Sequence, residues 1–107
     1  MFSNIDEIST NLREYFDTKG KTDIIPSNNT IVFLTTLIQL VPEYKKVFGN
    51  LLEPLLFLVK EKVGQIRKSA AILMANLCQE EKNLGEARRL HATEVLVNLS
   101  QVLLQSN

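Results

Sequence analysis

Apolar residues recur at intervals of three and four along most of the chain, the spacing that places side chains on one face of an α-helix. The pattern is clear over residues 4–17, 28–41, 51–62 and 66–78, and a short and a longer segment continue it from Leu84 to Leu103. No segment alternates with the period of a strand, and Asn-Gly and Asp-Gly hairpin signals are missing from the sequence. The pattern predicts an all-α protein of roughly six to seven helices.

Breaking and capping residues set the expected boundaries of these helices. Ser3 is a candidate N-cap for the first helix. Residues 18–27 are rich in breakers, so we expect a loop there. Pro42 should end the second helix and open a short one that Gly49 stops, and Asn50 can cap the next helix.

Three later breaks complete this outline. Pro54 falls near the first turn of the helix over 51–62, where its missing N–H costs least, and Gly64 interrupts the chain after that helix. Residues 79–83 are polar and predict a turn, and a further break is expected near His91.

The helix over 66–78 has the clearest division into two faces. Its core-facing stripe is predicted to consist of Ile66, Ala70, Leu73 and Leu77, broadened by Ala71, Met74 and Cys78. The helix over 28–41 is apolar over more than half of its circumference, which is typical of a helix packed on two sides.

Two partial self-matches indicate an internal repeat. Residues 53–56 align with residues 94–97 at an offset of 41, and residues between Leu34 and Val47 align with residues between Ala71 and Leu84 at an offset of 37. Residues inserted between the two matches reconcile the offsets. A period of this length is typical of α-solenoids, in which each unit packs on its neighbours.

The repeated segments resemble two related families. The series Ala75-Asn76-Leu77-Cys78, then Glu81-Lys82-Asn83, then residues 93–99 is similar to the armadillo repeat, which has an Asn-Leu helix end, a short helix and a Leu-Val-rich helix. Residues 51–71 resemble the HEAT repeat, with Glu61 where that pattern usually has Asp. The resemblance implies a right-handed α-solenoid of about two and a half repeats.

We therefore expect one helical domain over residues 1–107, made of a degenerate first unit (1–41), a complete unit (42–78) and a partial last unit (79–107). The segment 95–104 has too few charges for an ordinary solvated end of a solenoid. It fits a fragment of a longer protein, a dimer interface, or a last helix that closes over the core unaided. The candidate oligomer face consists of Val95, Leu99, Val102 and Leu103.

Charge and cysteine content narrow the function classes. Twelve basic and twelve acidic residues give zero net charge, which disfavours nucleic acid and anionic membranes as partners. A single cysteine cannot form an intramolecular disulfide, so we expect a reducing setting, cytoplasmic or nuclear. Residues 1–4 do not open a signal peptide, and no apolar run is long enough to cross a membrane.

Patterns for catalysis and metal binding are missing from the sequence. His91 is the only histidine, and the four glycines never form a phosphate-binding cluster. A Cys78–His91 nucleophilic pair is formally available, but Cys78 lies on an apolar stripe, as a small core residue would. Glu80 and Glu81 lie in a polar turn without an apolar pocket to raise a carboxyl pKa. We expect no enzymatic activity, no cofactor and no metal.

A binding surface is predicted opposite the core stripe of the helix over 66–78. The outer stripe of this helix consists of Gln65, Lys68, Ser69, Ile72 and Asn76. The offset of 37 relates it to Asn28, Ile31, Val32, Thr35 and Gln39.

In armadillo proteins such helices line a groove in which an Asn holds the backbone of an extended peptide, and the resemblance gives this role to Asn76, with Gln39 as a neighbour. An amide suits the role because it both donates and accepts hydrogen bonds. The alternative is that Asn76 only bonds an adjacent helix or loop. Thr35 and Ile72 replace the Trp of importin-type grooves, so basic nuclear-import peptides are not the expected ligands.

The sequence favours a non-catalytic module that binds a partner peptide or helix through this groove. The candidate groove residues are Gln39, Thr35, Lys68, Ser69, Ile72 and Asn76. The alternative is a homo-oligomerisation module, such as a homodimer, that uses the apolar C-terminal segment.

Overall fold

The computed structural model describes residues 4–105, and for residues 99–105 it describes the helix without the side chains. Within this range every regular element is helical, which confirms the all-α prediction. The elements, where η marks a 3-10 turn, are α1 (Ile5–Asp17), η2 (Lys19–Lys21), α2 (Ile24–Leu40), α3 (Tyr44–Val47), η3 (Phe48–Leu51), α4 (Leu52–Glu61), α5 (Gln65–Leu77), α6 (Glu81–Arg89) and α7 (Ala92–Gln105).

The start of α2 differs most from the sequence prediction. The helix begins at Ile24, so the expected loop over 18–27 contracts to η2 and a short link. Pro26 is compatible with this start because it lies in the first turn, where backbone N–H groups have no partner within the helix. The other end agrees with the prediction, since α2 finishes at Leu40, just before Pro42.

Three residues expected to mark helix ends have other roles. Gly49 lies inside η3, which joins α3 to α4 without a stop. Asn50 does not cap α4, because its side chain exchanges hydrogen bonds with Ser9 of α1, at 2.6 Å from the Ser9 hydroxyl and 3.2 Å to the Ser9 carbonyl. Asn83, expected in a turn, belongs to the first turn of α6. The predicted cap Ser3 lies outside the described residues.

Two positions with positive φ separate later helices where breaks were predicted. Gly64, with φ of 79°, precedes α5, and His91, with φ of 59°, separates α6 from α7. Glycine adopts this conformation without a steric penalty, and histidine is among the residues that enter the left-handed region more often than most.

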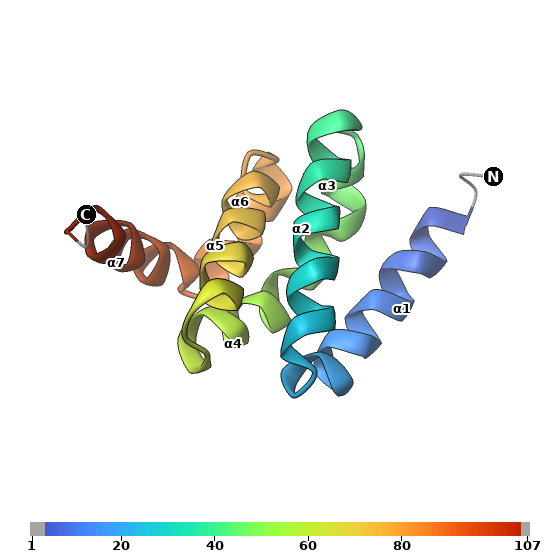
Figure 1. The fold of residues 1–107 in the computed structure, drawn as a ribbon. Helices are drawn as coiled ribbons and strands as arrows, with labels where there is room; N and C mark the ends of the chain where they lie inside the picture. The colour runs from blue at the N-terminus through green and yellow to red at the C-terminus, as the bar shows by residue number, and fades with distance from the viewer. Residues whose placement is uncertain (1–3, 106–107) are drawn as a thin grey trace.

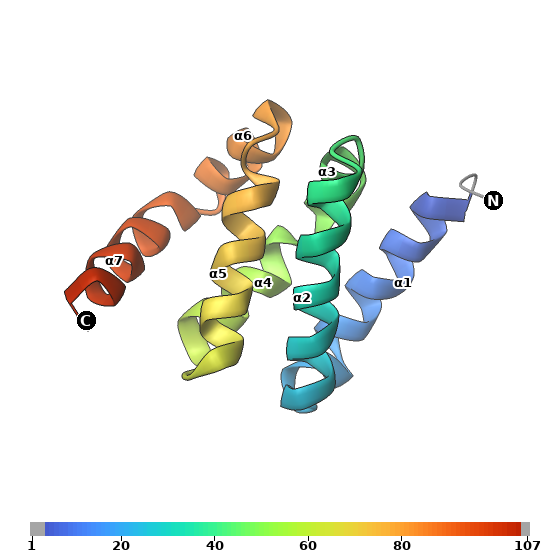
Figure 2. The same cartoon turned by 45° about the horizontal axis from the view of Figure 1, so that its top comes forward.

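α2 and α5 lie side by side and run in the same direction, with α3 and α4 behind them (Figure 1 and Figure 2). α1 flanks α2, and α6 and α7 follow on the α5 side. The Cα radius of gyration is 13.1 Å, close to the ~13 Å of a compact chain of about 100 residues. The described structure is therefore a compact all-α fold.

The core lies where α2, α4 and α5 meet. Ile31 and Ile38 of α2 and Leu55 of α4 are 0% exposed, and burying each such side chain stabilises the fold by about 1.5–3 kcal/mol. The predicted α5 stripe is confirmed as buried: Ile66, Ala70, Leu73 and Leu77. The prediction that α2 is packed on two sides is wrong, because its outward face carries exposed apolar side chains.

A buried amide fastens α6 to the rest of the fold. The Asn83 Nδ2 donates to the carbonyl oxygens of Lys45, at 2.7 Å, and Leu77, at 2.9 Å. A Cβ atom at residue 49 would overlap the Asn83 Oδ1, so a glycine is needed there. The role of Gly49 is therefore to let α6 approach η3 closely.

Candidate functional site

The outward faces of two neighbouring parallel helices form the α2–α5 surface. This surface consists of Ile25, Val32, Phe33, Gln39 and Leu40 of α2 and Lys68, Ile72 and Asn76 of α5. All of these side chains are exposed except Asn76, which is half-buried. The 3.6-residue period that buries one stripe of each helix places these residues on the other side.

Two amide side chains meet across the helices of this surface. The Gln39 Nε2 lies 3.5 Å from the Asn76 Oδ1, and the Asn76 Nδ2 donates to the carbonyl of Ile72 at 2.9 Å. Asn76 thus bonds its own helix and contacts the neighbouring one. This arrangement agrees with the alternative that Asn76 bonds an adjacent helix. The contact between the amides is at the long limit of a hydrogen bond and is correspondingly weak.

Some predicted groove residues lie beneath the surface rather than on it. Ser69 is only 4% exposed, and it lies on α5, which packs against both α2 and α4. Thr35 is half-buried, and its hydroxyl donates to the Ile31 carbonyl of its own helix at 2.9 Å. Ile31 itself belongs to the core. Of the predicted set, Gln39, Lys68 and Ile72 are exposed.

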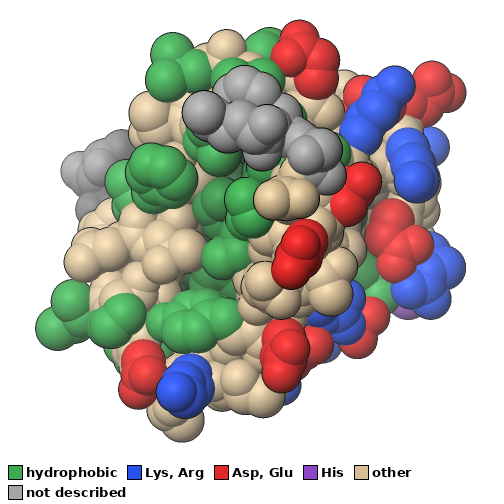
Figure 3. Space-filling model, turned by 90° about the vertical axis from the view of Figure 1, so that its right-hand side faces the viewer, with side chains coloured by type: hydrophobic (Ala, Val, Ile, Leu, Met, Phe, Trp, Pro, Cys, Tyr) green, Lys and Arg blue, Asp and Glu red, His purple; other side chains and the backbone are tan. Residues whose placement is uncertain are grey.

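Sequence reasoning missed two large apolar residues on the outward face of α2, Phe33 and Leu40. Phe33 is 65% exposed and Leu40 is 75% exposed, although α2 carries no charged residue from Ile24 to Leu40. Seen from the right-hand side of Figure 1, where α1 lies, hydrophobic side chains form a central band, and most charged side chains lie to its right (Figure 3). The sequence feature that could have revealed them is the absence of charge in α2. A helix without charges can be covered by the protein on both faces, or on one face with the other left exposed, and the sequence does not distinguish the two.

The candidate oligomer face on α7 is described only in part. Val95 is half-buried and packs against the core, so it is not part of an open face. The side chains of Leu99, Val102 and Leu103 lie outside the described residues. Val97, which the prediction did not include, is 51% exposed.

Cys78 and His91 lie in different settings. Cys78 is half-buried at the end of α5, and burial raises the pKa of its thiol, which disfavours the nucleophilic thiolate. His91 is exposed in the turn between α6 and α7. A search of residues 4–105 finds no cluster of His, Cys, Asp or Glu side chains that could hold a metal ion.

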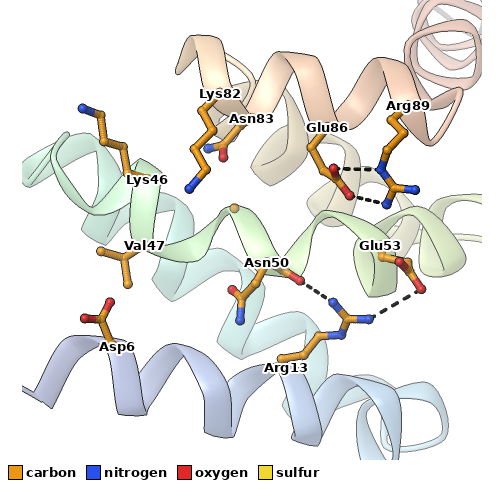
Figure 4. Close-up of a pocket in the computed structure, with 11 residues that line it drawn as sticks. Asp6, Arg13, Lys46, Val47, Asn50, Glu53, Lys82, Asn83, Glu86 and Arg89 are labelled. Carbon is orange, nitrogen blue, oxygen red and sulfur yellow. Dashed lines mark hydrogen bonds and ion pairs between the residues drawn. The ribbon is translucent and has the colours of Figure 1, made fainter.

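A polar hollow of about 650 Å³ lies between α1, η3, α4 and α6 (Figure 4). Arg13 Nη1 donates to the Asn50 carbonyl at 2.8 Å, and its Nη2 lies 3.5 Å from the Glu53 carboxylate. Arg89 donates to Glu86 through its Nε at 3.0 Å. The hydrogen bond from Arg89 lowers the pKa of Glu86, and the same bond raises the pKa of Arg89. The two arginines of the hollow are therefore engaged within the fold.

Comparison with protein-family models, curated proteins and solved structures finds no match to this chain. The helices of the described residues include none long and apolar enough to cross a membrane. Together these observations define an all-α protein whose family is not identified.

Proposed function

We propose that this chain is a non-catalytic protein-binding module that holds a peptide or helix of a partner protein on the α2–α5 surface. The observation that carries the proposal is the exposure of Phe33 and Leu40 on a helix without charges. Exposed apolar patches of this kind mark interaction sites, because a partner that covers them removes apolar area from water.

The two amides at the end of this surface support a peptide ligand. Gln39 and Asn76 carry donors and acceptors next to the exposed side chain of Ile72, which is 52% exposed. A peptide backbone offers the complementary groups, and the weak contact between the two amides costs little to replace.

The helix order supports a finer proposal, that the fold is an armadillo/HEAT-like right-handed solenoid. Gln39 and Asn76 are 37 residues apart, which is the repeat offset, and they are neighbours on parallel helices. In this interpretation α2 ends the first unit, α3 to α5 form the complete unit, and α6 and α7 begin the last one. One half-buried cysteine suits a reducing setting, for which we propose the cytoplasm or nucleus.

Affinity capture from cell extract with three versions of the chain tests the proposed function. The versions are the wild type, Phe33→Ser with Ile72→Ser, and a control with Glu7→Ser and Glu14→Ser on the exposed face of α1. We expect proteins retained by the wild type and the control to be lost from the surface variant, whose fold should be intact by circular dichroism. Identical capture by all three versions would contradict the proposal.

Homo-oligomerisation through α7 is the second candidate function. The exposed side chain of Val97 and the sequence of α7, in which Glu94 is the only charged residue, favour it. Light scattering during size exclusion over a hundredfold range of concentration tests it, with Val97→Asp as the disrupting variant. A monomer at every concentration would exclude this candidate.

A further inference from the structure

Charge is distributed unevenly in a chain whose net charge is zero. At the end of the molecule where α2 and α5 begin, six basic side chains are accompanied by three carboxylates, those of Asp17, Asp23 and Glu61, and Asp17 is paired with Arg13 at 2.8 Å. The six basic residues, here named the basic rim, are Lys19, Lys21, Lys60, Lys62, Arg67 and Lys68. Half of the basic residues of the chain therefore lie at one end.

The fold brings the basic rim together from three segments. η2 leads into α2, the end of α4 leads into α5, and both junctions lie at the same end of the fold (Figure 1). The Lys21 Nζ lies 4.6 Å from the centre of the Phe57 ring, which ties η2 to α4. The ion pairs found among the described residues involve Arg13 and Arg89, and neither belongs to the rim.

The opposite end of the α2–α5 surface lacks this excess of positive charge. Around the ends of α2 and α5, basic and acidic residues are equal in number: Lys45, Lys46 and Lys82 against Glu43, Glu80 and Glu81. The Lys45 Nζ is also engaged, donating to Gln79 at 2.6 Å. Positive charge therefore increases along the surface toward the helix starts, where the positive ends of two parallel helix dipoles add to it.

We propose that the partner segment held on the α2–α5 surface carries acidic residues beside its apolar ones, and that its acidic end lies at the basic rim. The inference rests on the proposed function, because it assigns a chemistry and a direction to the same ligand. Apolar contacts with residues such as Phe33 and Ile72 supply affinity, and complementary charge sets the orientation and the rate of association.

An acidic protein segment fits this arrangement better than a nucleic acid or a lipid surface. The rim borders an uncharged apolar face, which offers a phosphate backbone no basic side chains to bind. α1 carries Asp6, Glu7, Glu14 and Asp17 against a single basic residue, and these carboxylates would repel a long polyanion. Neutralising phosphates along an extended path requires basic residues along that path.

Three fluorescein-labelled peptides of one design test the inference with the full chain. Each joins an apolar block of leucine, valine and alanine to a block of four glutamates, four serines or four lysines. We expect the glutamate peptide to bind about tenfold more tightly than the lysine peptide in 50 mM salt. The difference should shrink in 300 mM salt, because screening weakens exposed charges.

Charge reversal at the rim supplies the matched variants. Lys60→Glu with Lys62→Glu should weaken binding of the glutamate peptide about fivefold or more, because it removes the positive excess. Lys46→Glu with Lys82→Glu, at the other end, should change it by less than about twofold. Both pairs lie outside the core, so circular dichroism and the unfolding midpoint should stay near those of the wild type.

The other outcomes separate this inference from the function on which it rests. Equal binding of all three peptides, lost in Phe33→Ser with Ile72→Ser, would overturn the acidic chemistry and keep the α2–α5 surface. A failure of every peptide to bind would overturn both. Tighter binding of phosphatidylserine vesicles or oligothymidine than of the glutamate peptide would also overturn the inference. A protein dimer that is abolished by reversing the charges of the basic rim would also overturn the inference. In that case the rim would bind the acidic α1 of a second copy of the chain.

Discussion

The α2–α5 surface and the polar hollow between α1 and α6 differ in what their side chains contact. In the hollow, Arg13 and Arg89 have carboxylate or carbonyl partners, and Asn83 donates two hydrogen bonds. On the α2–α5 surface, Phe33 and Leu40 face solvent without a covering helix. The polar contacts of the hollow therefore hold helices together. The exposed apolar side chains of the α2–α5 surface are instead available to a partner.

This contrast shows why a hollow is not by itself a binding site. The polar atoms around Asn83 are needed inside the fold, since leaving a buried carbonyl without a donor costs free energy. The apolar side chains of the α2–α5 surface contribute little to folding, because they stay in water. A change in the hollow should therefore lower stability, and a change on the surface should lower partner binding.

The largest contrast is expected within α2 itself. Ile38→Ala should lower the free energy of unfolding by about 2–5 kcal/mol, because it leaves a cavity in the core, whereas Phe33→Ala should change it by less than about 0.5 kcal/mol. Urea unfolding followed by circular dichroism measures both. A similar loss for both variants would mean that the outward face of α2 is packed.

The next largest effect on stability is expected at Asn83, whose amide holds α6 against the rest of the fold. Asn83→Ala should destabilise the protein by about 1–3 kcal/mol, since it leaves the carbonyls of Lys45 and Leu77 without their donor. The exposed Asn29→Ala is the control and should be near neutral. Gly49→Ala should also destabilise the protein, but less when Asn83 is already Ala, because the overlap with the amide is gone. Strict additivity of the two substitutions would contradict this contact.

A smaller effect is expected from the ion pair between α1 and α4. Glu53→Gln should lower the free energy of unfolding by less than about 1 kcal/mol, because the pair with Arg13 is long at 3.5 Å and partly exposed. The loss should vanish in 1 M salt, where exposed charges are screened. A large loss that persists in high salt would show that Glu53 has a packing role.

The smallest predicted effect is the titration of Glu86. The hydrogen bond from Arg89 lowers its carboxyl pKa, so NMR should find it below the ordinary range of a glutamate carboxyl. The stabilisation from this pair is present above the pKa of an unfolded glutamate and is lost as the pH falls through the lowered value. Arg89→Gln should return Glu86 to the ordinary range, and an unchanged titration would contradict the pairing.

Helices and their core faces could be predicted wherever one stripe was apolar and the other polar. α5 is the best case, since its buried residues follow the 3.6-residue period and Gly64 marks its start. α2 was harder, because its sequence is apolar on both faces and only tertiary packing decides which face is covered. Its early start does not follow from the sequence pattern, because Pro26 is typical of a loop as well as of the first turn of a helix.

The candidate site could be predicted only in part. The neighbouring positions of Gln39 and Asn76 follow from the repeat offset, and the structure places the two amides in contact. The burial of Ser69 depends on how the neighbouring helices pack on α5, which no local pattern contains. The pairing of Asn83 with Gly49 joins segments distant in sequence, so neither residue reveals it alone.

Methyl NMR during a peptide titration tests the central claim, that the α2–α5 surface is where a partner binds. The glutamate and serine peptides are added in separate titrations to protein with labelled isoleucine, leucine and valine methyl groups. We expect the methyl signals of Val32 and Ile72 to shift in at least one titration, while Val47, in the polar hollow, stays unchanged. Shifts centred on Val47, with Val32 and Ile72 unmoved, would contradict the claim.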